Sequence, residues 1–119
     1  MGGSRSIPLS VHAAIEMVAA PAIMAAPLLL GFGEAPAVVA FAIGAVLLGL
    51  AVEAAGPRRG VPLSAHAACD YAIAALAAIA GLVIGVATGE WAAGVFLAGV
   101  GVGQVALTAS TRFSVPLGA

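Results

Sequence analysis

The feature that most constrains the fold of this 119-residue chain is a series of four long apolar segments separated by short turns. The segments cover about residues 7–31, 36–55, 61–86 and 91–110, and the turns between them are rich in glycine, proline and charge. Each segment is long enough to cross a hydrocarbon core, which takes about 20 helical residues. A helix satisfies its own backbone groups, as lipid requires, whereas membrane strands alternate polar and apolar residues. The sequence therefore predicts an all-α fold, a four-helix transmembrane bundle.

The composition excludes the other broad classes of protein. The chain is 63% hydrophobic and 8% charged, whereas an ordinary soluble domain is about one quarter charged. Disordered chains are poor in apolar residues, so disorder is excluded as well. The net charge of −1 gives no electrostatic footprint for nucleic acid. Cys69 is the single cysteine, which excludes an internal disulfide framework and a cysteine-rich metal site. We expect the lipid bilayer, and no nucleic acid, as the partner.

The basic residues predict the orientation of the spans. All four lie on one side of a four-span topology: Arg5, Arg58, Arg59 and Arg112. The only charged residues in the loops on the opposite side are Glu34 and Glu90. The positive-inside rule therefore places both termini in the cytoplasm. His12 and Glu16 interrupt the first apolar segment, and we therefore expect it to be a span and not a signal peptide.

The chain contains an internal duplication. Residues 7–16 read Ile-Pro-Leu-Ser-Val-His-Ala-Ala-Ile-Glu, and residues 61–70, 54 positions later, read Val-Pro-Leu-Ser-Ala-His-Ala-Ala-Cys-Asp. Aligning Gly33-Glu34 with Gly89-Glu90 requires a two-residue insertion in the second copy. The single transmembrane domain, residues 1–119, is thus divided into repeat 1 (about 7–56), repeat 2 (about 61–111) and a tail (112–119). Two spans per copy make the repeats parallel, related by a pseudo-twofold axis along the membrane normal.

The tail carries a third copy of the repeat's opening tripeptide. Val115-Pro116-Leu117 lies 54 positions beyond Val61. It is either the start of a third hairpin that does not continue or a chance occurrence.

The repeat resembles a known family. Its Pro-Leu-Ser-x-His-Ala-Ala-x-[Glu/Asp] motif, followed by an apolar stretch and Ala26-Pro27-Leu28, is similar to the SPW-repeat proteins. The name refers to a Ser-Pro-Trp at the point where this chain has Ala26-Pro27-Leu28 in one copy and Ala80-Gly81-Leu82 in the other. These are small integral membrane proteins of bacteria, built from paired-helix repeats. The resemblance implies an architecture in the bacterial cytoplasmic membrane and carries no established activity.

Each repeat places a histidine four residues before a carboxylate, His12 with Glu16 and His66 with Asp70. Residues at this spacing share a helix face. Ionisable groups inside a span are costly and usually face a partner, so the two pairs are expected to converge. In the simplest interpretation the four side chains satisfy one another and hold the helices in register.

Three functional interpretations compete with that one. His12 and His66 are candidate axial ligands of haem b, with Glu16 and Asp70 orienting the imidazoles. The same four side chains are alternatively a transition-metal site. The third interpretation is a proton or ion pathway, which Gln104, Thr108 and Ser110 would extend.

The sequence shows no catalytic triad, phosphate loop or metalloprotease helix motif. We therefore expect a non-enzymatic membrane protein with a structural or accessory role, associated with itself or with a larger membrane complex. The alternative is a haem- or metal-binding protein that serves electron transfer or sensing.

Overall fold

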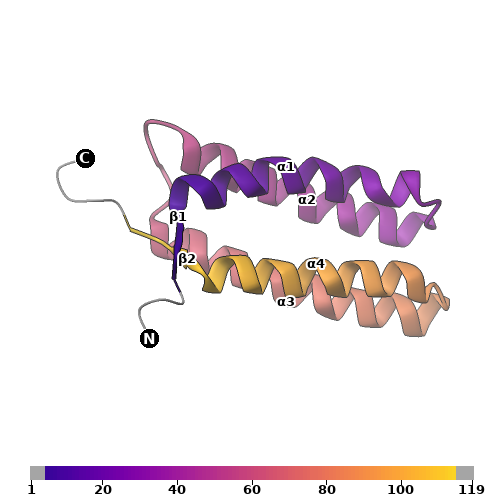
Figure 1. Cartoon of the computed structure of the whole chain (residues 1–119). Helices are drawn as coiled ribbons and strands as arrows, with labels where there is room; N and C mark the ends of the chain where they lie inside the picture. The colour runs from indigo at the N-terminus through magenta and orange to yellow at the C-terminus, as the bar shows by residue number, and fades with distance from the viewer. Residues whose placement is uncertain (1–4, 115–119) are drawn as a thin grey trace.

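The computed structural model describes residues 5–114 and contains four helices and one pair of very short strands (Figure 1). The elements in chain order are β1 (Ile7–Pro8), α1 (Leu9–Leu29), α2 (Glu34–Ala55), α3 (Leu63–Thr88), α4 (Trp91–Ala109) and β2 (Thr111–Arg112). The predicted all-α four-helix bundle is confirmed. All four helices are long and apolar enough to cross a bilayer, and large apolar side chains such as Val18, Leu29 and Val86 lie on the outer surface. The chain is an integral membrane protein.

The bundle consists of two helical hairpins, α1–α2 and α3–α4, that lie side by side (Figure 1). Within each hairpin a glycine lets the two backbones approach closely. A Cβ added at Gly44 of α2 would lie 2.8 Å from the carbonyl oxygen of Ala20 in α1. A Cβ added at Gly101 of α4 would lie 2.6 Å from the carbonyl oxygen of Ala74 in α3. Small residues at such contacts are the usual means of packing membrane helices.

The two hairpins bury corresponding positions. Residues 12, 16, 20 and 27 of α1 are buried, and so are the residues 54 positions later in α3. The buried residues of α2 recur 57 positions later: 36, 40, 44, 47, 51 and 54 correspond to 93, 97, 101, 104, 108 and 111. The second copy is therefore longer by three residues at its turn, and not by two. The alignment of the Gly-Glu turns was wrong by one residue because Glu34 begins α2 whereas Glu90 precedes α4.

The ends of the described chain pair with each other. Ile7 aligns with Thr111 and Pro8 with Arg112 in a parallel arrangement, and the Ile7 N–H donates to the Ser110 carbonyl over 3.0 Å. Helix α1 therefore begins at Leu9, since Ile7 and Pro8 are extended, and Arg112 belongs to a strand and not to a free tail. The Val115–Leu117 tripeptide lies outside the described residues.

Gly81 and Gly99 make a matched pair for testing the packing within the second hairpin. A Cβ at Gly81 would meet the Gly94 carbonyl oxygen at 2.5 Å and the Ala98 nitrogen at 2.9 Å, whereas a Cβ at Gly99 has nothing within 4 Å. We predict that Gly81→Ala destabilises the protein by about 1–3 kcal/mol through overpacking. Gly99→Ala should be neutral or stabilising. Thermal unfolding in detergent measures both changes, and equal effects would contradict this packing.

Candidate functional site: a buried His–carboxylate quartet

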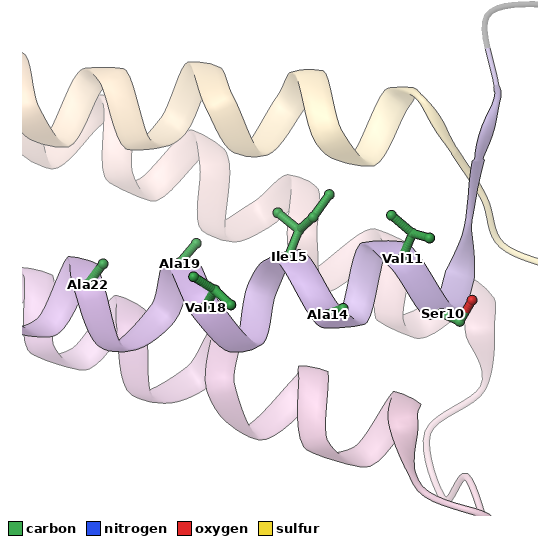
Figure 2. A pocket seen from close by; sticks show the side chains of 7 residues that line it. All are labelled: Ser10, Val11, Ala14, Ile15, Val18, Ala19 and Ala22. Atoms are coloured by element: carbon green, nitrogen blue, oxygen red, sulfur yellow. The ribbon is translucent and has the colours of Figure 1, made fainter.

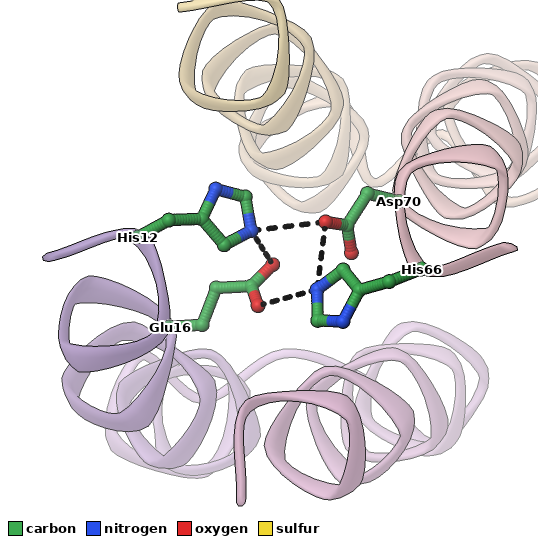
Figure 3. A group of neighbouring side chains, drawn as sticks. All are labelled: His12, Glu16, His66 and Asp70. Carbon is green, nitrogen blue, oxygen red and sulfur yellow. Dashed lines mark hydrogen bonds and ion pairs between the residues drawn. The ribbon is translucent and has the colours of Figure 1, made fainter. Parts of the chain in front are cut away.

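The structure brings the four predicted site residues together in one buried group, called the quartet below. Its members are His12 and Glu16 from α1 and His66 and Asp70 from α3 (Figure 3). One ligand atom from each residue lies within 4.8 Å of the others. All four residues are at most 1% exposed, although the chain is small. The i, i+4 spacing places each pair on one helix face, and those two faces meet between the hairpins.

The imidazole nitrogens and carboxylate oxygens alternate around the group (Figure 3). The Nε2 atom of His12 lies 2.9 Å from Asp70 Oδ2 and 3.2 Å from Glu16 Oε2. The Nε2 atom of His66 lies 3.2 Å from Asp70 Oδ2 and 3.6 Å from Glu16 Oε1. Each nitrogen therefore contacts a carboxylate of its own helix and one of the other hairpin.

The quartet lies near the end of the bundle that carries the chain termini. Because α1 begins at Leu9, a rise of 1.5 Å per residue places His12 about 4–5 Å and Glu16 about 10–11 Å along the helix. A helix that began at residue 7, where the first apolar segment of the sequence starts, would place both side chains about 3 Å farther along. The group thus lies in the half of the bundle that carries β1 and β2.

Two residues outside the quartet hold its α1 half in place. The Thr111 hydroxyl donates to the Leu107 carbonyl over 2.6 Å, so its oxygen accepts the Nδ1–H of His12 at 2.8 Å. The side-chain amide of Gln104 donates to Glu16 Oε2 over 2.8 Å. From the sequence, Gln104 was predicted only as part of a proton or ion pathway, and Thr111 was not predicted to belong to the site. The helical spacing of residues 104, 108 and 111 was the feature of the sequence that could have indicated a polar face directed at the quartet.

Four polar atoms of the quartet have no hydrogen-bond partner among the described residues. They are Glu16 Oε1, Asp70 Oδ1 and both ring nitrogens of His66. Phe113 packs against both imidazoles, with ring centroids 5.1 Å from His12 and 5.7 Å from His66, and offers neither ring an acceptor. A buried polar atom without a partner is costly, so the quartet has the capacity to bind a further group.

The other residues proposed for the site lie elsewhere or act differently. Thr108 is buried beside Gln104, whose amide lies 3.4 Å from the Thr108 hydroxyl. Ser110 contributes its backbone carbonyl to Ile7. Cys69, although adjacent to Asp70 in sequence, is exposed on the outside of the bundle.

A groove of about 560 Å³ runs along the outer face of α1, apart from the quartet (Figure 2). Apolar side chains, among them Val11, Ile15 and Val18, line it, with Ser10 at one end. These residues are exposed. The groove therefore belongs to the apolar outer surface of a membrane protein and offers no polar group for chemistry.

No family model, no curated protein and no solved structure matches this chain. The assignment of a function therefore rests on the quartet and its surroundings.

The contact between His12 and Asp70 joins the two hairpins and is testable by a double-mutant cycle. We predict that His12→Ala and Asp70→Ala each destabilise the protein and that the two losses are non-additive by about 0.5–3 kcal/mol. Unfolding in mixed detergent with a chelator present measures this coupling without metal. The control pair is His12→Ala with Tyr71→Phe, because Tyr71 adjoins Asp70 in sequence but is exposed. A coupling no larger than that of the control pair would contradict the contact.

Proposed function

We propose that this integral membrane protein is non-enzymatic and holds one divalent transition-metal ion, of the Zn²⁺ class, in the quartet. The observation that carries the proposal is the spacing of the donor atoms. In a tetrahedral site with bonds of about 2.0–2.1 Å, neighbouring donors lie about 3.3–3.4 Å apart. The four nitrogen–oxygen contacts of the quartet measure 2.9, 3.2, 3.2 and 3.6 Å, and the two to Glu16 end on different oxygens of its carboxylate. One donor atom from each of the four residues lies within 4.8 Å of the others, so a bound ion would draw the most widely spaced donors together by about 1.5 Å to reach the tetrahedral spacing.

The charge and chemistry of the donors favour the same ion. Two carboxylates carry two negative charges, which one dication neutralises inside an apolar bundle. Imidazole and carboxylate together suit Zn²⁺ and its first-row neighbours. An ion at the centre would also bind Glu16 Oε1 and His66 Nε2, which have ion-pair contacts but no hydrogen bond among the described residues.

The contact of His12 with Thr111 gives further support. A metal-bound histidine usually donates its other ring N–H to an oxygen, which fixes the tautomer and directs the lone pair at the ion. His12 donates Nδ1–H to Thr111, and its Nε2 atom lies within the quartet.

Haem is disfavoured by the same geometry. A haem iron already has four equatorial nitrogens, and its macrocycle would have to lie between His12 and His66. The carboxylates of Glu16 and Asp70 occupy that space, because each contacts the Nε2 atoms of both imidazoles. The haem b interpretation therefore has little support.

A through-pathway for protons or ions is also disfavoured. The buried polar side chains among the described residues are the quartet, Gln104, Thr108 and Thr111. All lie toward the end of the bundle that carries β1 and β2. No buried polar side chain among residues 5–114 continues toward the opposite surface.

The second candidate function is a metal-free clasp in a structural or accessory protein. It is favoured by the 2.9 Å contact of His12 with Asp70, which crosses from one hairpin to the other. In this state His12 carries a proton on both ring nitrogens, since both face acceptors. Such a clasp would stabilise the bundle for association with itself or with a larger membrane complex.

A metal-binding measurement on purified protein distinguishes the two candidates. We predict that protein stripped with a chelator binds one Co²⁺ or Zn²⁺ per chain, and that Co²⁺ gives the intense visible bands of a tetrahedral site. His66→Ala should weaken binding by more than about tenfold, since loss of an outer partner alone costs 10–100-fold. Cys69→Ala should bind as the wild type does, because Cys69 is exposed outside the quartet. A folded wild-type protein that binds no ion would favour the clasp.

We further propose that both termini lie in the cytoplasm of a bacterial cell, as the distribution of arginines and the SPW-repeat resemblance suggest. Glu34→Cys and Arg59→Cys, each made in a Cys69→Ala background, test the orientation. A membrane-impermeant maleimide added to intact cells should label the cysteine at position 34 and not the one at 59. The opposite labelling would reverse the topology.

A further inference from the structure

The two halves of the quartet are unequally supported. On the α1 side, Thr111 accepts from His12 and Gln104 donates to Glu16. On the α3 side, His66 Nδ1 and Asp70 Oδ1 have no partner among residues 5–114. The contacts that cross between the repeats differ in the same sense. His12 lies 2.9 Å from Asp70, whereas the corresponding distance from His66 to Glu16 is 3.6 Å.

The cause of this asymmetry lies in the register of the two hairpins. The buried positions of α2 correspond to those of α4 with a shift of 57 residues. Ala54 thus corresponds to Thr111, and Leu47 corresponds to Gln104. Both residues are buried, at 4% and 1% exposure, but neither side chain forms hydrogen bonds. The α3 half lacks partners where the first hairpin has alanine and leucine in place of threonine and glutamine.

We propose that Thr111 and Gln104 are positioning residues that make His12 and Glu16 the permanent ligands of the ion, while His66 is the ligand that leaves and returns during metal exchange. This inference rests on the proposed metal site. A second hydrogen bond fixes the tautomer and orientation of a ligating imidazole and raises its basicity. His12 has such a bond, so its rotation away from the ion breaks two interactions. His66 has none among the described residues, so within that part of the chain its rotation breaks only the bond to the ion.

The surroundings of His66 are consistent with a ligand that can move. Its ring packs against Phe113 and, edge to face, against His12 at a centroid distance of 5.5 Å. Neither contact includes a hydrogen bond to the imidazole of His66. Phe113 follows β2 and is only partly buried, so the ring of His66 lies close to the end of the bundle. Phe113 also packs against His12, at 5.1 Å, so an ion arriving from that end would meet both imidazoles, and the difference between them lies in their hydrogen bonds.

The test removes support from one half of the site and adds it to the other. Thr111→Val deletes the acceptor of His12, and Thr111→Ser restores it. Ala54→Thr places a hydroxyl at the position that corresponds to Thr111, within the half that contains His66. Ala55→Thr is the matched control, because it introduces the same side chain at the adjacent, exposed position. The readouts are the visible spectrum of bound Co²⁺, its dissociation constant, and its release rate into excess chelator.

We expect Thr111→Val to weaken Co²⁺ binding by about 10–100-fold and to alter the visible bands, with recovery in Thr111→Ser. Ala54→Thr should slow Co²⁺ release by about tenfold, as expected of a newly supported ligand, and Ala55→Thr should leave it unchanged. Leu47→Gln, which adds an amide for Asp70, replaces Ala54→Thr if that variant does not fold.

The outcomes separate this inference from the proposed function. Wild-type protein that binds no Co²⁺ overturns both. A second outcome overturns only the assignment of permanent and leaving ligands. In it the wild-type protein binds Co²⁺, and neither Thr111→Val nor the added group (Ala54→Thr or Leu47→Gln) changes the affinity or the release rate. A release rate that falls equally in Ala54→Thr and Ala55→Thr also overturns it.

Discussion

Hydrocarbon offers no hydrogen bonds to a charged or polar side chain, and the four ionisable residues buried between α1 and α3 must therefore satisfy one another or bind an ion. This requirement determines which faces of α1 and α3 point into the interior of the bundle, where the four side chains meet (Figure 3). The small-residue contacts at Gly44 and Gly101 hold each hairpin together, but they do not determine how one hairpin lies against the other. At one end of the bundle the contacts within the quartet determine how the hairpins lie against each other. At the opposite end the Gly33 N–H donates to Glu90 Oε1 over 2.8 Å, so a second polar contact joins the hairpins there.

The duplication explains why four ionisable groups can converge without a long polar surface. Two hairpins of similar sequence bury corresponding positions and so bring the same residue types to the bundle interior from both sides, as in a symmetric dimer interface. A contact from His12 to Asp70 then has a counterpart from His66 to Glu16. Covalent linkage frees the two copies to diverge at the supporting positions while the central residues stay matched. The quartet is nearly symmetric, whereas the residues that form hydrogen bonds to it, Gln104 and Thr111, are present on one side only.

Much of this architecture was predictable from the sequence, for identifiable reasons. The four spans follow from the length of the apolar runs, and the convergence of His12 with Asp70 follows from the helical spacing and the repeat. The contact of Thr111 with His12 was not predictable, since Thr111 follows the last helix and lies 99 residues away in the chain. The shift of 57 residues between α2 and α4 was also missed. Glu34 and Glu90 look equivalent in the sequence, but one begins a helix and the other bonds to the opposite hairpin.

The pairing of β1 with β2 gives the chain a nearly circular path. Ile7 lies beside Thr111 and donates its N–H to the Ser110 carbonyl, and the link between the hairpins, residues 56–62, lies at the same end of the bundle (Figure 1). The two hairpins are thus joined twice at this end, once by peptide bonds and once by strand pairing. A peptide link between β2 and β1 could therefore take the place of the link formed by residues 56–62. A circular permutant that opens the chain near Arg59 and links the strand at residues 111–112 to the strand at residues 7–8 would keep every helix neighbour and would place the α3–α4 hairpin before the α1–α2 hairpin in the chain.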